Sequence, residues 1–284
     1  MTNEIKALIK NWKETVDREI GLDTLYLFGS SIYQKGQMFT PSKSDLDLIA
    51  IIPSKQDNAI DRSNWIYALK KHKSVLEKDL LFLLKRESNT EEIVSLVPIT
   101  ELELAFNIHK GETRNFFEIN QFMNIDTDII LKGSEIFAFK VCQNEFVIQV
   151  LKSIQKARNK YLKNSAMHDF KELEWSGSDI LPKEFARESA KTASLTEESF
   201  EAGDELNTSF GNDYIKQNLK KLRSFSEYSE LYTWIDTRSG GRSNSLEKNV
   251  LNQNKHLLLY EFLYDLTIRD MRNTESSKKK YQLK

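Results

Sequence analysis

The sequence has one cysteine, Cys142, among 284 residues, so no disulfide can form within the chain. Its four histidines are scattered, and none of them has the spacing of a zinc site. Neither positive nor negative charge is in excess, since the chain has 41 basic and 42 acidic residues. The chain therefore has no overall field that would draw it to duplex nucleic acid or an anionic membrane, and any contact with a polyanion must be local.

Long hydrophobic runs are also missing. The first residues contain no apolar core of a secretory signal, and no apolar run is long enough to cross a bilayer. We therefore expect a cytoplasmic protein with no membrane partner. The glycine-rich phosphate motifs G-x-x-x-x-G-K-[ST] and G-x-G-x-x-G are absent as well, so a phosphate site in this chain must be built differently.

The elements that the sequence does contain alternate between helix and strand patterns in the first half. Residues 3–20 and 61–84 repeat apolar residues as an amphipathic helix does, although residues 80–84 could equally begin a strand. Two short apolar runs, 25–28 and 46–52, have the composition of buried strands. A third strand is predicted within residues 91–109, with acids alternating against apolar residues and so lying on one face.

The second half has a helical character. The expected fold is α+β, with a small mixed sheet in a catalytic domain of residues 1–135 and a mostly helical domain of residues 136–272. Residues 273–284 are basic and contain few apolar side chains, so we expect a flexible tail there.

Polar residues gather where the first predicted strand ends and the second begins. Asp45 and Asp47 are two residues apart on a strand and project from the same face. At roughly 4 Å their repulsion would be on the order of 4 kcal/mol at an effective dielectric of 20, and a divalent cation would reverse it. Oxygen ligands favour Mg²⁺ or Mn²⁺. Gly29 lets a backbone approach a phosphate closely, and Ser30 and Ser31 offer donors to it.

A strand that ends in Gly-Ser, followed by a strand that bears Asp-x-Asp, resembles the signature of the DNA polymerase β-like nucleotidyltransferase superfamily. The resemblance is close over residues 22–52 and loose over residues 93–110. One departure is that 14 residues separate Ser30 from Asp45, slightly more than the compact motif has. An enlarged loop over residues 36–44 would account for the difference.

The resemblance implies roles for particular residues. Gly29 and Ser30 would hold a triphosphate, and Asp45 and Asp47 would bind two metal ions. A third acid from a neighbouring strand would complete the metal site and help to deprotonate the attacking hydroxyl. Glu103 is favoured over Glu101 for this role because it lies deeper in the apolar run, while Ser95 lies where some relatives have an aspartate, so the assignment stays open.

Two further groups of side chains could contact the substrate. Lys152 and Lys156 lie four apart on a predicted helix, where relatives often place a basic residue against the triphosphate, although a solvated helix face has the same pattern. Phe116, Phe117 and Phe122 could stack on a base, but a hydrophobic core is the commoner fate of such a cluster.

The function that these residues predict is metal-dependent transfer of a nucleoside monophosphate, from an NTP or dNTP to a hydroxyl, with release of pyrophosphate. The length of the polar second half favours a cyclic or short oligonucleotide product in antiphage signalling, as in the bacterial defence (CD-NTase-like) branch. The partners would be a nucleoside triphosphate, a short single-stranded oligonucleotide and an effector or regulatory protein. The alternatives are an adenylyltransferase that modifies an antibiotic, RNA or protein, and an inactive nucleotide-binding sensor or antitoxin.

Overall fold

The structure is a computed structural model that describes residues 2–86, 92–109, 111, 115–163, 183–196, 208–222, 226–239 and 252–282. The chain divides into two compact units. The first consists of Met1–Asp57, Asp61–Val141 and Gln155–Lys171, and the second of Asn58–Ile60, Cys142–Ile154 and Glu172–Lys284. The domain boundary near residue 135 stays a prediction.

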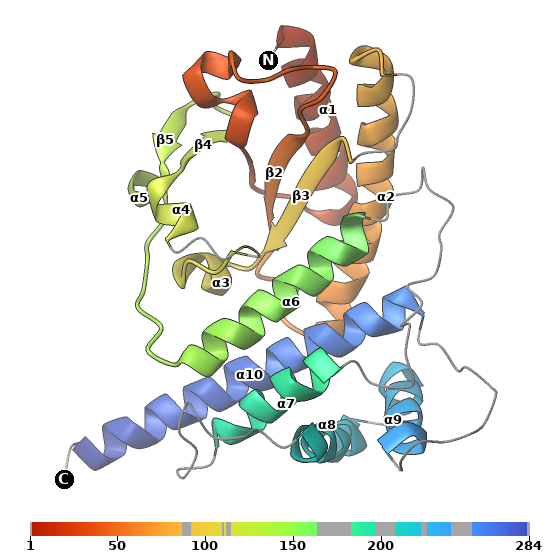
Figure 1. The fold of residues 1–284 in the computed structure, drawn as a ribbon, viewed down its shortest axis with the longest axis vertical. Coiled ribbons are helices and arrows are strands. Elements are labelled where there is room, and N and C mark those ends of the chain that lie inside the picture. The colour runs from red at the N-terminus through yellow and green to blue at the C-terminus, as the bar shows by residue number, and fades with distance from the viewer. Residues whose placement is uncertain are drawn as a thin grey trace. The chain divides into compact units, whose positions relative to one another are not determined.

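The first unit is built on a five-stranded sheet with the strand order β3-β2-β1-β4-β5 (Figure 1). Its strands are β1 (Leu25–Phe28), β2 (Leu46–Ile51), β3 (Val94–Ile99), β4 (Gln121–Asn124) and β5 (Ile130–Lys132). The pair at one edge of the sheet, β2 and β3, is parallel, and all other neighbours are antiparallel. The expected mixed sheet is therefore confirmed, as are the two predicted strands on either side of the Gly-Ser turn.

Two long helices lie wholly or almost wholly in this unit, α1 (Asn3–Ile20) and α2 (Ala59–Leu83). Thr2 caps the start of α1, and Gly21 ends it in the left-handed conformation, where a residue without a Cβ is favoured. The indole of Trp12 donates to the carbonyl oxygen of His72 at 2.8 Å, which joins α1 to α2. Because α2 continues to Leu83, almost all of residues 80–84 are helical.

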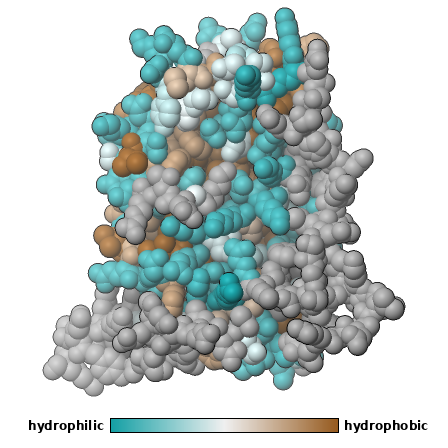
Figure 2. All heavy atoms as spheres, viewed as in Figure 1, coloured by the Kyte–Doolittle hydropathy of each residue, from teal (hydrophilic) through white to brown (hydrophobic). Residues whose placement is uncertain are grey.

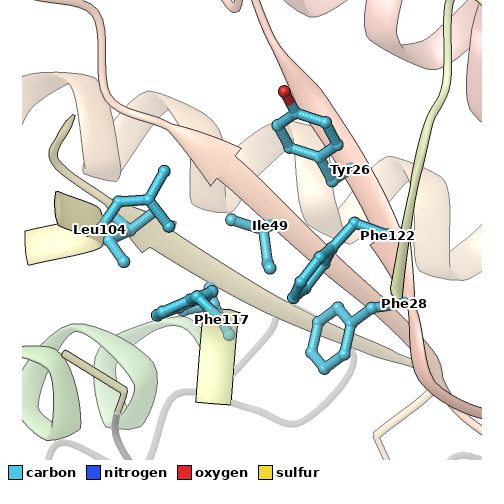
Figure 3. Close-up of a cluster of buried hydrophobic side chains, with 8 residues drawn as sticks. Tyr26, Phe28, Ile49, Leu104, Phe117 and Phe122 are labelled. Atoms are coloured by element: carbon cyan, nitrogen blue, oxygen red, sulfur yellow. The ribbon is translucent and has the colours of Figure 1, made fainter. Parts of the chain in front are cut away.

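Alternate residues of the central strands face opposite sides of the sheet. One side holds a buried cluster of aromatic and aliphatic side chains, drawn in Figure 3: Tyr26, Phe28, Ile49, Val97, Ile99, Leu104, Phe117 and Phe122. Two of the three phenylalanines singled out in the sequence, Phe117 and Phe122, are fully buried there, so they are core residues. Asp47 is two residues before Ile49 on β2 and therefore leaves the sheet on the side of this cluster.

The third strand ends earlier than the sequence pattern predicted, and the prediction of a strand through residues 101–106 was wrong. After Ile99 the chain turns into the short helix α3 (Glu101–Ala105). The hydroxyl of Thr100 accepts from the backbone nitrogen of Glu103 at 3.2 Å, and the Glu103 carboxylate accepts from the backbone nitrogen of Thr100 at 2.9 Å. This reciprocal capping box starts a helix, and an alternation only a few residues long is too weak to oppose it.

Short elements complete the first unit. They are the 3₁₀ turns η1 (Gly29–Ser31) and η2 (Tyr33–Gly36), and the helices α4 (Phe116–Ile119) and α5 (Gly133–Ile136). The remaining helices are α6 (Glu145–Lys163), α7 (Lys183–Ser194), α8 (Thr208–Leu222), α9 (Ser226–Ser239) and α10 (Gln253–Gln282). Helix α6 contributes residues to both compact units.

The regular secondary structure in the described part of the second unit is all helical, as expected. Helices α7 and α8 approach closely, because a Cβ on Gly211 would lie 2.5 Å from the carbonyl oxygen of Ala186. The hydroxyls of Thr192 on α7 and Thr267 on α10 are 2.9 Å apart in a buried hydrogen bond. Helix α10 runs to Gln282 and so includes most of residues 273–284, where a flexible tail was expected. The flexibility of this segment stays a prediction.

The described helices include none that is long and apolar enough to cross a membrane. Hydrophilic residues predominate among the coloured atoms of the face shown in Figure 2, and hydrophobic residues form small patches between them.

Candidate active site

The turn after β1 is the first part of the site. Gly29 has φ +73°, a left-handed conformation that other L-residues adopt at a cost. The turn is closed by Ile32, whose nitrogen donates to the carbonyl oxygen of Gly29 at 3.1 Å. The buried hydroxyl of Ser31 donates to the carbonyl oxygen of Phe28 at 3.0 Å. The Ser31 proton is therefore used inside the turn, whereas Ser30 is partly exposed.

The Asp47 carboxylate lies directly against this turn. Strands β1 and β2 pair so that Phe28 is opposite Asp47. A Cβ built on Gly29 would lie 2.4 Å from Oδ2 of Asp47 and 3.3 Å from its Cγ. The carboxylate thus occupies the space that a side chain at position 29 would need. The backbone angle favours glycine, and this contact requires it.

Asp45 lies immediately before β2, and it is partly buried, as Asp47 is. Between them Leu46 is fully buried, and its backbone nitrogen donates to the carbonyl oxygen of Ile93 at 2.8 Å. Because Leu46 points to the side of the sheet away from the aromatic cluster, alternation along an extended chain directs Asp45 and Asp47 to the side of that cluster. The two carboxylates and the Gly29 turn therefore lie at one end of the sheet.

These residues fit a hard divalent cation. Both side chains are oxygen donors, and the bare α-carbon of Gly29 is what allows the Asp47 carboxylate to lie beside the turn. Within the described ranges, no group of three or more His, Cys, Asp or Glu side chains could hold a metal ion. Two aspartates are nevertheless a sufficient protein contribution, since Mg²⁺ commonly binds through one or two carboxylates together with water and substrate phosphates.

Tyr33 is a neighbour of the site that sequence reasoning missed. Its hydroxyl donates to Oδ1 of Asn120 at 2.7 Å, which ties the loop after the turn to the end of α4. Burial, and then the negative charge of Asp47, raise the pKa of Tyr33. The phenol is therefore close enough to sense the Asp47 charge, and it remains a neutral donor at physiological pH. The sequence did place Tyr33 only four residues after Gly29, and this nearness to the turn could have indicated it as a neighbour of the site.

Glu103 does not occupy the position that the predicted strand assigned to it. The register pairs Asp47 with Ser95, and α3 begins only after β3 has ended at Ile99. The Glu103 carboxylate is fully buried and also accepts from Nη1 of Arg158 at 2.7 Å. The choice of Glu103 as the third metal ligand therefore loses its basis, because that acid lies past the opposite end of β3 and serves a helix cap and an ion pair.

The same register bears on the other two candidates for the third acid. Glu101 is exposed in the first turn of α3, also beyond the end of β3. Ser95 is buried beside Asp47, so a serine stands where a carboxylate could have joined the pair.

The two lysines predicted to contact a triphosphate lie on α6. Lys156 is exposed, whereas its neighbour Gln155 is buried and donates to the carbonyl oxygen of Ile108 at 2.8 Å. Lys152 is partly buried and belongs to the second unit. Contact between either lysine and a nucleotide stays a prediction.

The third phenylalanine singled out in the sequence, Phe116, is partly buried and stacks on His109. Their ring centroids are 3.8 Å apart with an interplanar angle of 10°. Phe116 also meets Phe28 edge to face at 5.6 Å, which connects the stack to the strand that leads into Gly29. The stacking partner of Phe116 is therefore a side chain of the protein itself.

No curated protein sequence matches the chain. Among solved structures, it matches spectinomycin adenyltransferase AAD(9) from Enterococcus faecialis with ATP and spectinomycin, at 15% sequence identity. This match covers 94% of the present chain and 99% of the other, with a TM-score of 0.23. A family model described as a Pol beta superfamily nucleotidyltransferase in conflict systems matches residues 8–269. The match spans both halves of the chain and confirms the resemblance carried by Gly29, Ser30, Asp45 and Asp47: the protein is a nucleotidyltransferase and belongs to this family.

Proposed function

We propose that this nucleotidyltransferase moves a nucleoside monophosphate from a nucleoside triphosphate to a hydroxyl group and releases pyrophosphate. The observation that carries the proposal is the contact between Asp47 and Gly29. The Asp47 carboxylate lies against the bare α-carbon of Gly29, and a Cβ on Gly29 would be only 2.4 Å from its Oδ2 atom. We infer from this contact that a metal ligand and a phosphate-binding turn lie side by side.

The side chains have separate tasks in this proposal. Asp45 and Asp47 would hold Mg²⁺ or Mn²⁺, and the open turn at Gly29 and Ser30 would receive the triphosphate. The bound cation would neutralise charge on the phosphate oxygens during transfer. The neutral hydroxyl of Tyr33, held by Asn120, adds no negative charge beside a substrate that is already an anion.

We infer that the acceptor hydroxyl belongs to a nucleotide, so that the product is a cyclic or short oligonucleotide that signals in antiphage defence in the cytoplasm. Two observations support this choice over a small-molecule acceptor. The family is described as one of conflict systems. The second compact unit contains helices α7 to α10, a longer segment than a pocket for a small acceptor requires.

The test is incubation of the purified full chain with all four NTPs, in Mg²⁺ or Mn²⁺, followed by a pyrophosphate assay and mass spectrometry of the products. Asp47→Asn serves as the matched control, because it removes one charge at nearly constant volume. Cyclic or linear oligonucleotides made by wild type and not by Asp47→Asn would support the proposal. Pyrophosphate release only when an antibiotic, RNA or protein is added would overturn the nucleotide acceptor, and no release under any condition would overturn nucleotidyl transfer.

A further inference from the structure

A single arginine holds the loop that leads into the aspartate pair. Arg86 follows the carboxyl end of α2, and its Nε donates to the carbonyl oxygen of Pro41 at 2.8 Å. Its Nη2 donates to the carbonyl oxygen of Ser44, the residue directly before Asp45. We propose that Arg86 is a positioning residue for the metal site, which fixes Asp45 by holding the peptide that precedes it. This inference rests on the proposed function.

The segment before Ser44 depends on such bonds because, of residues 37–43, Phe39 alone is buried. Residues 40–43 are exposed, and Met38 is 56% exposed. Within the loop, the nitrogen of Ser44 donates to the carbonyl oxygen of Thr40 at 2.8 Å, and the Ser44 hydroxyl accepts from the nitrogen of Thr40 at 2.9 Å. These bonds close the turn on itself but do not attach it to the sheet. Arg86 supplies an attachment to a helix end elsewhere in the unit.

The backbone upstream of the turn makes this attachment more important. Gln34 and Lys35 have φ of 49° and 58°, and neither is a glycine. Consecutive left-handed residues are costly and persist only where the surroundings hold them. Downstream, by contrast, Leu46 is fixed in the core. Asp45 is therefore the junction between a costly, exposed loop and a rigid strand, and its placement relative to Asp47 depends on how the loop is held.

Arginine is suited to this task in a way that lysine is not. Its planar guanidinium presents several N–H donors in a fixed fork, so it can bind two carbonyl oxygens at once. Both of these bonds go to peptide carbonyls of neighbouring residues, Pro41 and Ser44. The arginine can thus fix the backbone at Asp45 without consuming the carboxylate that a cation requires.

The experiment measures Mn²⁺ binding to the full chain by electron paramagnetic resonance, in the presence of a non-hydrolysable nucleoside triphosphate. We expect Arg86→Ala to weaken Mn²⁺ binding by about 10-fold or more, the usual cost of removing a group that supports a metal ligand. Arg86→Lys should give a smaller loss, because an ammonium keeps the charge and its donors but lacks the fixed fork of the guanidinium. Ser44→Ala, which loosens the same turn, should also weaken binding.

The matched control is Arg62→Lys. Arg62 lies on α2, the helix that Arg86 follows, and its Nη1 donates to a loop carbonyl, that of Gln56, at 3.5 Å. It should leave Mn²⁺ affinity within twofold of wild type. Circular dichroism and melting temperature show which variants are folded. If Arg86→Ala does not fold, the Mn²⁺ affinities of Arg86→Lys and Ser44→Ala decide whether Arg86 positions the metal site.

The outcomes are distinguishable from failure of the proposed function. Equal Mn²⁺ affinity in wild type and a folded Arg86→Ala would overturn the role of Arg86 alone, even if its melting temperature falls. Wild type that binds Mn²⁺ without transferring nucleotides would overturn the proposed reaction, while the comparison at Arg86 would still hold. Wild type that binds no Mn²⁺ would overturn both.

Discussion

Gly29→Ala should leave a folded protein that has lost almost all of its turnover. The new Cβ would lie 2.4 Å from Oδ2 of Asp47, about 1 Å inside an ordinary contact. Either the turn or the carboxylate must move by roughly that distance, and a misplacement of about 1 Å can cost about 100-fold in rate. The left-handed φ of +73° adds a loss of stability of about 1–2 kcal/mol. Pyrophosphate release and urea unfolding would measure the two effects.

Gly21→Ala is the matched control for this prediction. Gly21 has nearly the same backbone angle, φ +74°, but the atom that its Cβ would meet is Nζ of Lys55 at 2.6 Å. That atom is the end of a flexible side chain and can move aside. Gly21→Ala should therefore lose about as much stability, about 1–2 kcal/mol, and keep its turnover. A rate for Gly29→Ala within threefold of wild type, or an equal loss of rate in both variants, would refute the reasoning.

Three further predictions concern charge. Asp45→Asn or Asp47→Asn should abolish turnover and leave the fold intact, because each removes a ligand charge without changing volume; pyrophosphate release near the wild-type rate would contradict the metal site. Glu103→Gln should lower the unfolding free energy by about 3–5 kcal/mol, because it removes the carboxylate charge 2.7 Å from the buried guanidinium of Arg158, and a loss of turnover at unchanged stability would return Glu103 to the active site. Burial, and then the charge of Lys73, lower the pKa of Lys70 to about 8. Between pH 8 and 10 the unfolded chain therefore binds more protons than the folded chain. The free energy of unfolding should rise with pH over this range by up to about 2 kcal/mol. Urea unfolding at several pH values would measure this rise, and Lys70→Met should remove it.

The part of the site that could be predicted from sequence is the part made by neighbouring residues. Gly29 and Ser30 end one strand, and Asp45 and Asp47 begin the strand that pairs with it. A hairpin-like arrangement of this kind needs only local signals, namely apolar runs, turn formers and alternation. The predicted strands on either side of the turn, and the helical character of the second half, were accordingly correct.

The third acid could not be predicted in the same way. Alternation of Glu and Leu over residues 101–104 fits a strand or one turn of helix equally well. The sequence did contain the deciding signal, since Thr100 and Glu103 have the spacing of a capping box. The partner of Glu103, by contrast, is 55 residues away on α6, and no local pattern indicates such a pair. The same applies to Tyr33 and Arg86, whose partners lie 87 and more than 40 residues away along the chain.

The contact between Gly29 and Asp47 also makes the two positions interdependent over evolutionary time. Asparagine tolerates a left-handed backbone, so the angle alone would allow position 29 to vary. The Asp47 carboxylate excludes any side chain at position 29 for as long as position 47 is an aspartate. A descendant that no longer needed Asp47 and replaced it with a smaller residue would free position 29 to accept other side chains. Drift away from glycine there would then mark a branch of the family that has lost the proposed metal site.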